Sequence, residues 1–183
     1  MEHPGEIWQE YDFNGERLGG IEPDKCDFDA IRLMGGVALM LYRVRDGEVE
    51  FLFQHRSKLL RANPDKWDVS AGGHVNLDEP VIDALVRETR EEIGVDIDKN
   101  KVEYAMTYLR WKVLIHLYYY DWGDRPDEFS FDDQEVEEVK WVKYSELKDF
   151  YPNLKWSDYG EDEFFTLSIE ELKNRVLEKS GNI

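Results

Sequence analysis

The sequence predicts an α/β fold in which a mixed β-sheet lies between helices. Segments rich in β-branched and aromatic residues, which are typical of strands, occur along most of the chain. An amphipathic helical segment stands in the middle, and further helical segments come near the C-terminal end. Because strands precede and follow the central helix, we expect a sheet with helices packed against it.

Two β-hairpins are expected in the first third of the chain. The segment IWQEYDFNGERLGG has two short alternating arms around Asn14-Gly15. Further on, Val37–Val44 and Val49–Gln54 flank Asp46-Gly47. Asn-Gly and Asp-Gly pairs adopt the left-handed backbone that tight hairpin turns require, so both segments predict paired strands.

A loop with two glycines is expected to lead into the central helix. Pro64 and the pair Gly72-Gly73 interrupt the segment RANPDKWDVSAGG, which predicts a tight turn without regular structure. From Pro80 to Ile93 the period becomes helical, and Gly94 is expected to end the helix in a left-handed conformation. The apolar face of this helix comprises Val81, Ile82, Leu85, Val86 and Thr89.

The second half of the chain predicts three more strands and two helices. KVEYAMTYLR and KVLIHLYYYDW are strand-like, and EVEEVKWVKY follows the loop GDRPDEFSFDDQ as another strand. SELKDF is expected to begin a short helix. Ser168 and Glu171 form a capping-box pattern that predicts a last helix starting there and running to about Glu178.

The composition favours one globular domain over residues 1–183, with a core of about 6–147 and a helical extension of about 148–183. The chain has 41 Asp and Glu against 23 Lys and Arg, a formal charge of −18, which argues against nucleic acid as a partner. No apolar run reaches the roughly 20 residues of a membrane span. With the single cysteine Cys26 and no secretory signal, we expect a cytoplasmic protein without membrane contact.

Three carboxylates of the central helix raise a specific question. Glu88, Glu91 and Glu92 stand at i, i+3 and i+4 and therefore project from one side of the helix, where they repel one another. They also lie in its last turn, where the helix dipole disfavours anions. Arg87 balances only one of them. A divalent cation such as Mg²⁺ or Mn²⁺ is one explanation, and a solvated acidic face is the other.

A set of residues with fixed spacing surrounds this helix: Gly73, Glu79, Arg87, Glu88, Glu91, Glu92 and Gly94. This pattern resembles the signature of the Nudix hydrolase family. The segments EIWQEYDFNGERLG and FQHRSKLLRANPDKWDVSAGGHV are similar to the branch that contains isopentenyl-diphosphate isomerase and its hydrolytic relatives. The resemblance spans roughly residues 6 to 147 and implies a Nudix-like α/β/α sandwich. One departure is Pro80 directly after Glu79, where many members have a Ser or Thr.

The resemblance assigns a role to each of these positions. It implies that Glu88, Glu91 and Glu92 bind Mg²⁺ or Mn²⁺ together with the backbone carbonyl of Gly72, and that Glu91 or Glu92 also orients the attacking water. The remaining positions are expected to support the site. Gly73 allows close folding against the helix, Glu79 anchors the loop, Arg87 holds Glu79 and Glu91 in place, and Gly94 ends the helix.

The implied reaction is hydrolysis of a small-molecule pyrophosphate, typically a nucleoside diphosphate joined to another group. A general base from outside the signature is still needed. Glu135 is the first candidate and Glu138 the second, with a solvated strand edge as the alternative for both. Arg56 and Lys58 are candidates to bind phosphate oxygens, although ordinary surface charge explains them as well.

The role of His74 stays open between a metal ligand, as in the isomerase, and a structural hydrogen bond. The isomerase reaction itself needs a cysteine just before the glycine pair, and Gly72 occupies that position. Cys26 lies far away in the sequence. A non-catalytic nucleotide-binding regulator is a further alternative, which the intact carboxylates disfavour. A homodimer is expected only by analogy with the family.

Overall fold

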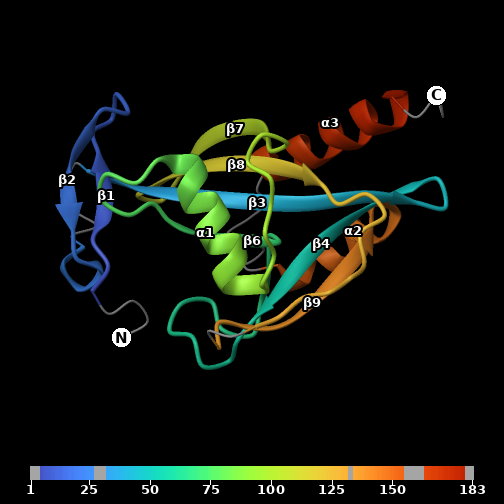
Figure 1. Cartoon of the computed structure of the whole chain (residues 1–183), viewed down its shortest axis with the longest axis horizontal. Coiled ribbons are helices and arrows are strands. Elements are labelled where there is room, and N and C mark those ends of the chain that lie inside the picture. The colour runs from blue at the N-terminus through green and yellow to red at the C-terminus, as the bar shows by residue number, and fades with distance from the viewer. Residues whose placement is uncertain (1–4, 27–31, 132–133, 155–162, 180–183) are drawn as a thin grey trace.

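The computed structural model describes residues 5–26, 32–131, 134–154 and 163–179, which form a nine-stranded mixed sheet with helices on both faces (Figure 1). Within these ranges no helix is long and apolar enough to cross a membrane. The strands are β1 (Trp8–Tyr11), β2 (Arg17–Ile21), β3 (Leu33–Arg45), β4 (Glu48–Arg56), β5 (Trp67–Asp68), β6 (Ala71–His74), β7 (Glu103–Arg110), β8 (Val113–Asp121) and β9 (Val136–Lys143). The helices are α1 (Val81–Ile93), α2 (Leu147–Phe150) and α3 (Glu163–Lys179), with short 3₁₀ turns at Pro23–Lys25, Tyr144–Glu146 and Tyr151–Asn153.

The long strand β3 organises the sheet. It pairs parallel with β8 over nine residue positions, from Met34 opposite Val113 to Tyr42 opposite Asp121. It also pairs antiparallel with β1, β4 and β6, and β4 in turn carries β5 and β9. The sheet therefore contains both parallel and antiparallel pairs, which confirms the predicted α/β class with a mixed sheet.

Both faces of the central strands are buried, which explains why β3 carries no charged residue from Leu33 to Tyr42. α1 packs on β3 and β6 on one face (Figure 1). That core comprises Val37, Leu39, Leu41 and Leu52 of the sheet with Ala84, Leu85 and Ile93 of the helix. On the opposite face the core comprises Ala38, Met40, Phe51 and Phe53 with Phe150 of α2, Leu154, and Ile169 and Leu172 of α3.

Both predicted hairpins are present. Asp46 and Gly47 have φ values of 53° and 78° and join β3 to β4 in a two-residue turn. The first hairpin has a longer loop, in which the Asp12 carboxylate accepts backbone hydrogen bonds from Asn14 at 2.8 Å and Glu16 at 2.9 Å. These bonds lower the pKa of Asp12, led by the bond from Glu16.

The prediction of a tight turn at the glycine pair was wrong. Gly72 and Gly73 lie in strand β6, paired with Ala38 and Val37 of β3. These glycines do not form a turn. They allow neighbouring groups to approach the backbone of β6 closely. A Cβ atom on Gly72 would lie 2.7 Å from the carbonyl oxygen of Val37, and one on Gly73 would collide with the carboxyl group of Glu88. Such short strands form through their pairing with β3, which a local sequence pattern does not reveal.

The predicted start of the last helix was also wrong. α3 begins at Glu163, so Ser168 lies within the helix and not at its cap. Ser168 is buried beside Ile169, which belongs to the core on that face. The helical pattern extends upstream of Ser168 through the sequence EFFTL, and this apolar stretch outweighs the capping-box signal.

Gly94 ends α1 as predicted, with a φ of 70° and its N–H bonded to the carbonyl oxygens of Arg90 and Thr89. The loop that follows β8 returns to this point, where the backbone N–H of Ser130 donates to the oxygen of Ile93 at 3.1 Å. A Cβ on Gly94 would collide with the Ser130 side chain. Gly94 is therefore required both by its backbone conformation and by this contact.

The variant Gly94→Ala tests this double requirement. Gly47→Ala is the matched control, because Gly47 also has a positive φ but has open space around its Cβ position. We expect Gly47→Ala to lower the free energy of unfolding by about 1 kcal/mol and Gly94→Ala by roughly 2–4 kcal/mol, measured by urea titration. Equal losses would show that the Ser130 contact relaxes without cost.

Candidate active site

The three carboxylates on one side of α1 differ in burial, from an exposed group to one inside the core. The Glu91 side chain is 52% exposed, and that of Glu88 is 14% exposed. Glu92 is almost completely buried, at 3% for the whole residue. The common spacing predicted one shared face, but the three groups occupy very different environments.

Glu92 is a buried carboxyl group with few hydrogen-bond partners. The backbone N–H of Gly72 donates to its Oε2 at 2.6 Å, and the Gln54 amide lies 3.2 Å from each of its oxygens. Burial, followed by the nearby Glu88, raises the pKa of Glu92 well above its ordinary value. The contacts with Gly72 and Gln54 and the charge of Arg56 oppose this increase.

Glu88 lies against the bare backbone of Gly73, which leaves room for its carboxyl group. Burial raises the pKa of Glu88 to about 7. Arg87 opposes this rise, whereas the negative charges of Glu91 and Glu6 add to it. Glu88 therefore sits in a place where negative charge is poorly compensated by the protein.

Arg87 is the cation that connects the site. Its guanidinium donates to both oxygens of Glu79 at 2.9 and 3.0 Å, to Glu88 at 2.8 Å and to Glu91 at 3.0 Å. It also donates to the backbone oxygen of His74 at 2.9 Å. Burial alone would raise the pKa of Glu79, but the bonds from Arg87 and Asn76 lower it. The predicted contacts of Arg87 with Glu79 and Glu91 are both present.

The donor chemistry of the site suits a hard divalent cation. Carboxylate oxygens are the protein ligands that Mg²⁺ and Mn²⁺ prefer, and the bare backbone of Gly73 admits the carboxyl group of Glu88 at this point. Within the described ranges, however, no three Asp, Glu, His or Cys side chains are grouped closely enough to hold a metal ion. Glu91 is directed to Arg87 instead. The residues fit an ion in kind, and an ion shared by all three carboxylates would require Glu91 to leave its contact with Arg87.

His74 and Trp8 form one boundary of the site. Their rings are stacked with centroids 3.6 Å apart and an interplanar angle of 9°. The Trp8 indole N–H donates to Glu6 at 2.8 Å. Glu6, which influences the pKa of Glu88, thus lies at the same end of the site. The ring of His74 packs on Trp8, while its backbone oxygen binds Arg87.

Arg56 lies on the α1 side of β4 and is largely buried. Its Nη2 donates to the backbone oxygen of Ala62 at 3.1 Å, and its Nη1 lies 3.6 Å from Asp68. Its charge acts on Glu92, which places it near the carboxylates of α1. Lys58 is exposed and lies 3.7 Å from Asp65. The structure therefore brings Arg56, but not Lys58, toward the carboxylates.

The candidate bases lie opposite the end of β4, with Glu135 directly before β9 and Glu138 within it. Glu135 is partly buried, and its backbone oxygen accepts a hydrogen bond from Ser57 at 2.8 Å, next to Arg56. Glu138 pairs with His55 in the sheet, and its carboxylate lies 3.6 Å from that imidazole. Glu135 is thus closer in position to Arg56, and its role as a base remains a prediction.

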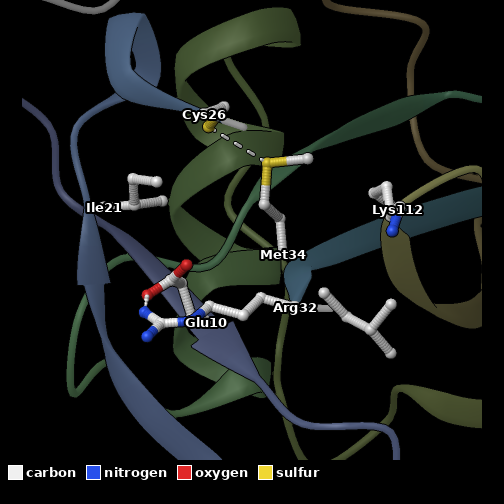
Figure 2. Close-up of a pocket in the computed structure, with 7 residues that line it drawn as sticks. Glu10, Ile21, Cys26, Arg32, Met34 and Lys112 are labelled. Atoms are coloured by element: carbon white, nitrogen blue, oxygen red, sulfur yellow. Dashed lines mark hydrogen bonds and ion pairs between the residues drawn. The ribbon is translucent and has the colours of Figure 1, made fainter. Parts of the chain in front are cut away.

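Cys26 lies in a separate small pocket of about 10 Å³ (Figure 2). Its Sγ is 3.3 Å from the sulfur of Met34. The glycine strand β6 lies further along β3, because Gly72 pairs with Ala38. Ala38 is four residues from Met34, a distance of about 13 Å along the strand. Burial, followed by the charge of Glu10, raises the pKa of the thiol. The other residues that line the pocket are Glu10, Ile21, Arg32, Leu33 and Lys112.

Two contacts of the site were not predicted from the sequence. One is the bond from Gln54 to Glu92, and the other is the stack of Trp8 on His74. For Gln54 a weak signal exists, because an amide stands in the otherwise apolar part of the strand EVEFLFQHR. For Trp8 no local pattern indicates its partner, because the residues that separate it from His74 form several other strands.

The pKa of Glu88 predicts how the metal-free protein responds to pH. The folded protein binds a proton on Glu88 up to about pH 7, whereas the unfolded chain releases it near 4.5. Between these values the folded state binds more protons, so stability falls as the pH rises, by up to about 3 kcal/mol. Glu88→Gln should remove this part of the loss, measured by urea titration between pH 4.5 and 8.

Glu16→Gln is the control for this measurement, because Glu16 is exposed in the first hairpin loop. It should leave the pH dependence as in the wild type. A Glu88→Gln variant that loses stability with rising pH as steeply as the wild type would contradict the assigned environment of Glu88.

Comparison with known proteins places these features in a family. The NUDIX domain model matches residues 34–164. An uncharacterised Nudix hydrolase of Clostridium acetobutylicum is 30% identical over 118 residues, which cover 60% of this chain and 57% of that protein. An isopentenyl-diphosphate Δ-isomerase of Cutibacterium acnes is 27% identical over 103 residues, which cover 47% of this chain and 49% of the isomerase. The chain thus spans about half the length of these curated relatives.

The fold comparison agrees with the family match. The crystal structure of DR0079 from Deinococcus radiodurans has a TM-score of 0.63 with 22% sequence identity, covering 78% of this chain and 86% of that chain. At this identity the similarity shows a shared fold. Because the family model matches well over half of the 183 residues, the chain belongs to the Nudix family.

Proposed function

We propose that this protein hydrolyses the diphosphate linkage of a small organic pyrophosphate, a nucleoside diphosphate derivative in particular, in a reaction that depends on Mg²⁺ or Mn²⁺. The observation that carries the proposal is the set of three carboxylates on α1, two of them largely buried and held against glycine backbone. Their negative charge is poorly compensated within the protein, and a divalent cation is the ligand that would compensate it.

Glu88, Glu91 and Glu92 are the residues proposed to hold the ion, together with the backbone carbonyl of Gly72. When bound, the ion would neutralise the pyrophosphate and lower the pKa of a bound water. Arg87 contacts Glu88 and Glu91 directly and would limit the positions that these carboxylates adopt. Gly73 has no side chain, which allows the carboxyl group of Glu88 to lie against the backbone of β6.

Proton transfer from the attacking water is assigned to carboxylates of this chain. Glu91 or Glu92 would orient the water, and Glu135 is the proposed general base. The backbone oxygen of Glu135 binds the N–H of Ser57, so Glu135 lies next to the end of β4 that carries Arg56.

Arg56, with its charge near Glu92, is proposed to bind phosphate oxygens. His74, stacked on Trp8 at the boundary of the site, is a second candidate to contact the substrate. Lys58 lies near Asp65 and is not included in this proposal.

The isomerase alternative is disfavoured by the place of the only thiol. Cys26 contacts Met34 (Figure 2). The residues that line this pocket do not include those of the glycine strand β6. Gly72, at the position where the isomerase needs its cysteine, offers no group that protonates a substrate. A nucleotide-binding regulator without turnover keeps the same fold, and the activity assay separates it from the enzyme.

The proposal predicts that the diphosphate linkage is cleaved in at least one member of a panel of nucleotide sugars, dinucleotides and nucleoside triphosphates. Cleavage releases two phosphorylated products, such as a nucleoside monophosphate and a sugar phosphate from a nucleotide sugar. Cleavage should require Mg²⁺ or Mn²⁺ and stop when a chelator is added, because water attack needs the ion. Chromatography of the products provides the measurement, supported by colorimetric phosphate detection after the products have been treated with a phosphatase. No cleavage of any member with either ion would favour the non-catalytic regulator.

Glu91→Gln tests the assignment of the site, because it removes one charge and preserves the shape of the side chain. We expect kcat to fall by roughly 10²–10⁴-fold, measured on the substrate found in the panel. Folding should be retained, with a stability equal to or slightly above that of the wild type, because one repulsion is lost.

The matched control is Glu170→Gln, which removes a carboxylate from the exposed side of α3. It should leave kcat unchanged. If Glu91→Gln retained the activity of this control, the proposed role of Glu91 would be wrong.

A further inference from the structure

Gln54 connects the sheet to the most buried carboxylate of α1. The residue is completely buried, with 0% of its surface exposed. Its Nε2 lies 3.2 Å from each oxygen of Glu92, and the backbone N–H of Gly72 donates to Oε2 at 2.6 Å. One amide group thus faces both oxygens of the carboxylate, while one backbone group binds a single oxygen.

Packing alone does not explain an amide at this position. Leu52, two residues earlier on the same face of β4, belongs to the apolar core around α1. Burial of an amide costs free energy unless its polar atoms are bonded. The Oε1 atom of Gln54 has no hydrogen-bond partner within the described part of the chain. An apolar side chain would avoid this cost, so the amide is best explained by what its N–H group does for Glu92.

The backbone of Gln54 is held firmly. In the sheet it lies between Val139 of β9 and Asp68 of β5, with partners on both sides. Arg56, two residues further on the same face, favours the charged form of Glu92. The amide is therefore presented from a rigid strand, whereas Glu92 comes from the last turn of a helix.

We infer that Gln54 is a positioning residue, which fixes the orientation of the Glu92 carboxylate for ion binding and water attack. This inference rests on the proposed function. Gln54 touches neither the substrate nor the ion and acts only through Glu92. Groups that orient metal-binding carboxylates contribute to affinity and rate without binding the metal themselves.

Gln54→Met tests the inference, because Met has a similar volume and no amide. We expect the affinity for Mn²⁺, measured by calorimetry without substrate, to fall by about 10- to 100-fold. On the substrate found in the panel, kcat should fall by a similar factor, while KM stays within about threefold. Gln54→Asn keeps the amide but shortens its reach, so it should lose Mn²⁺ affinity as well and provides a second variant if the first folds poorly.

Phe53→Leu is the matched control, because Phe53 is the neighbouring residue on β4, is also fully buried, and faces the opposite core. It should lower the melting temperature and leave the Mn²⁺ affinity unchanged. A role of Gln54 in packing alone predicts the same result for Gln54→Met. A Gln54→Met variant that lowers the melting temperature but keeps wild-type Mn²⁺ affinity and kcat would therefore overturn the inference.

A double-mutant cycle with Glu92→Gln tests whether Gln54 acts through Glu92. Glu92→Gln alone should weaken Mn²⁺ binding, and the addition of Gln54→Met should then weaken it by less than about twofold. A full additional loss in the double variant would show that Gln54 acts by another route. If the wild type neither binds Mn²⁺ nor shows turnover, the proposed function fails and the role of Gln54 fails with it. If the wild type is active and Gln54→Met keeps the same Mn²⁺ affinity and kcat, only the inference about Gln54 is rejected.

Discussion

The contact between helix α1 and strand β6 is the constraint on which the candidate site depends. Three consecutive residues of β6 each meet a charged side chain of the helix. Gly72 donates its N–H to Glu92, Gly73 leaves space for Glu88, and His74 offers its backbone oxygen to Arg87. The strand takes part through its backbone, and this explains why side chains are absent at the first two positions.

The fold was predictable wherever the pattern is local and long. The hairpin at Asp46-Gly47, the helix up to Gly94 and the aromatic strands of the second half all follow from periodicity and turn chemistry. The strands β5 and β6 were missed because each has only two to four residues and forms through its partners. At Ser168 a common capping pattern occurs inside a helix, where the burial of the serine is decided by tertiary packing.

The site was predictable only in the part that one helix determines. Helical spacing places Glu91 one turn after Arg87, and the structure has that contact. The same spacing gives no information on burial, so it did not distinguish exposed Glu91 from buried Glu92. The partners of Glu92 come from β4 and β6, and such pairings between distant segments depend on the sheet topology.

Strand β4 shows how the two cores divide structural and chemical roles. Successive side chains of a strand point to opposite faces, so Gln54 faces α1 while Phe53 faces the other core, where its ring centroid lies 5.0 Å from that of Phe150. The apolar packing on that face supports the backbone of β4, while β5 and β9 hold the strand on either side of Gln54. The residues of α2 thus stabilise the strand that presents Gln54 without contacting Glu92 themselves. Because the sheet pairing also fixes the direction of Gln54, a substitution in that core is expected to lower the stability of the fold and to leave the geometry around Glu92 unchanged.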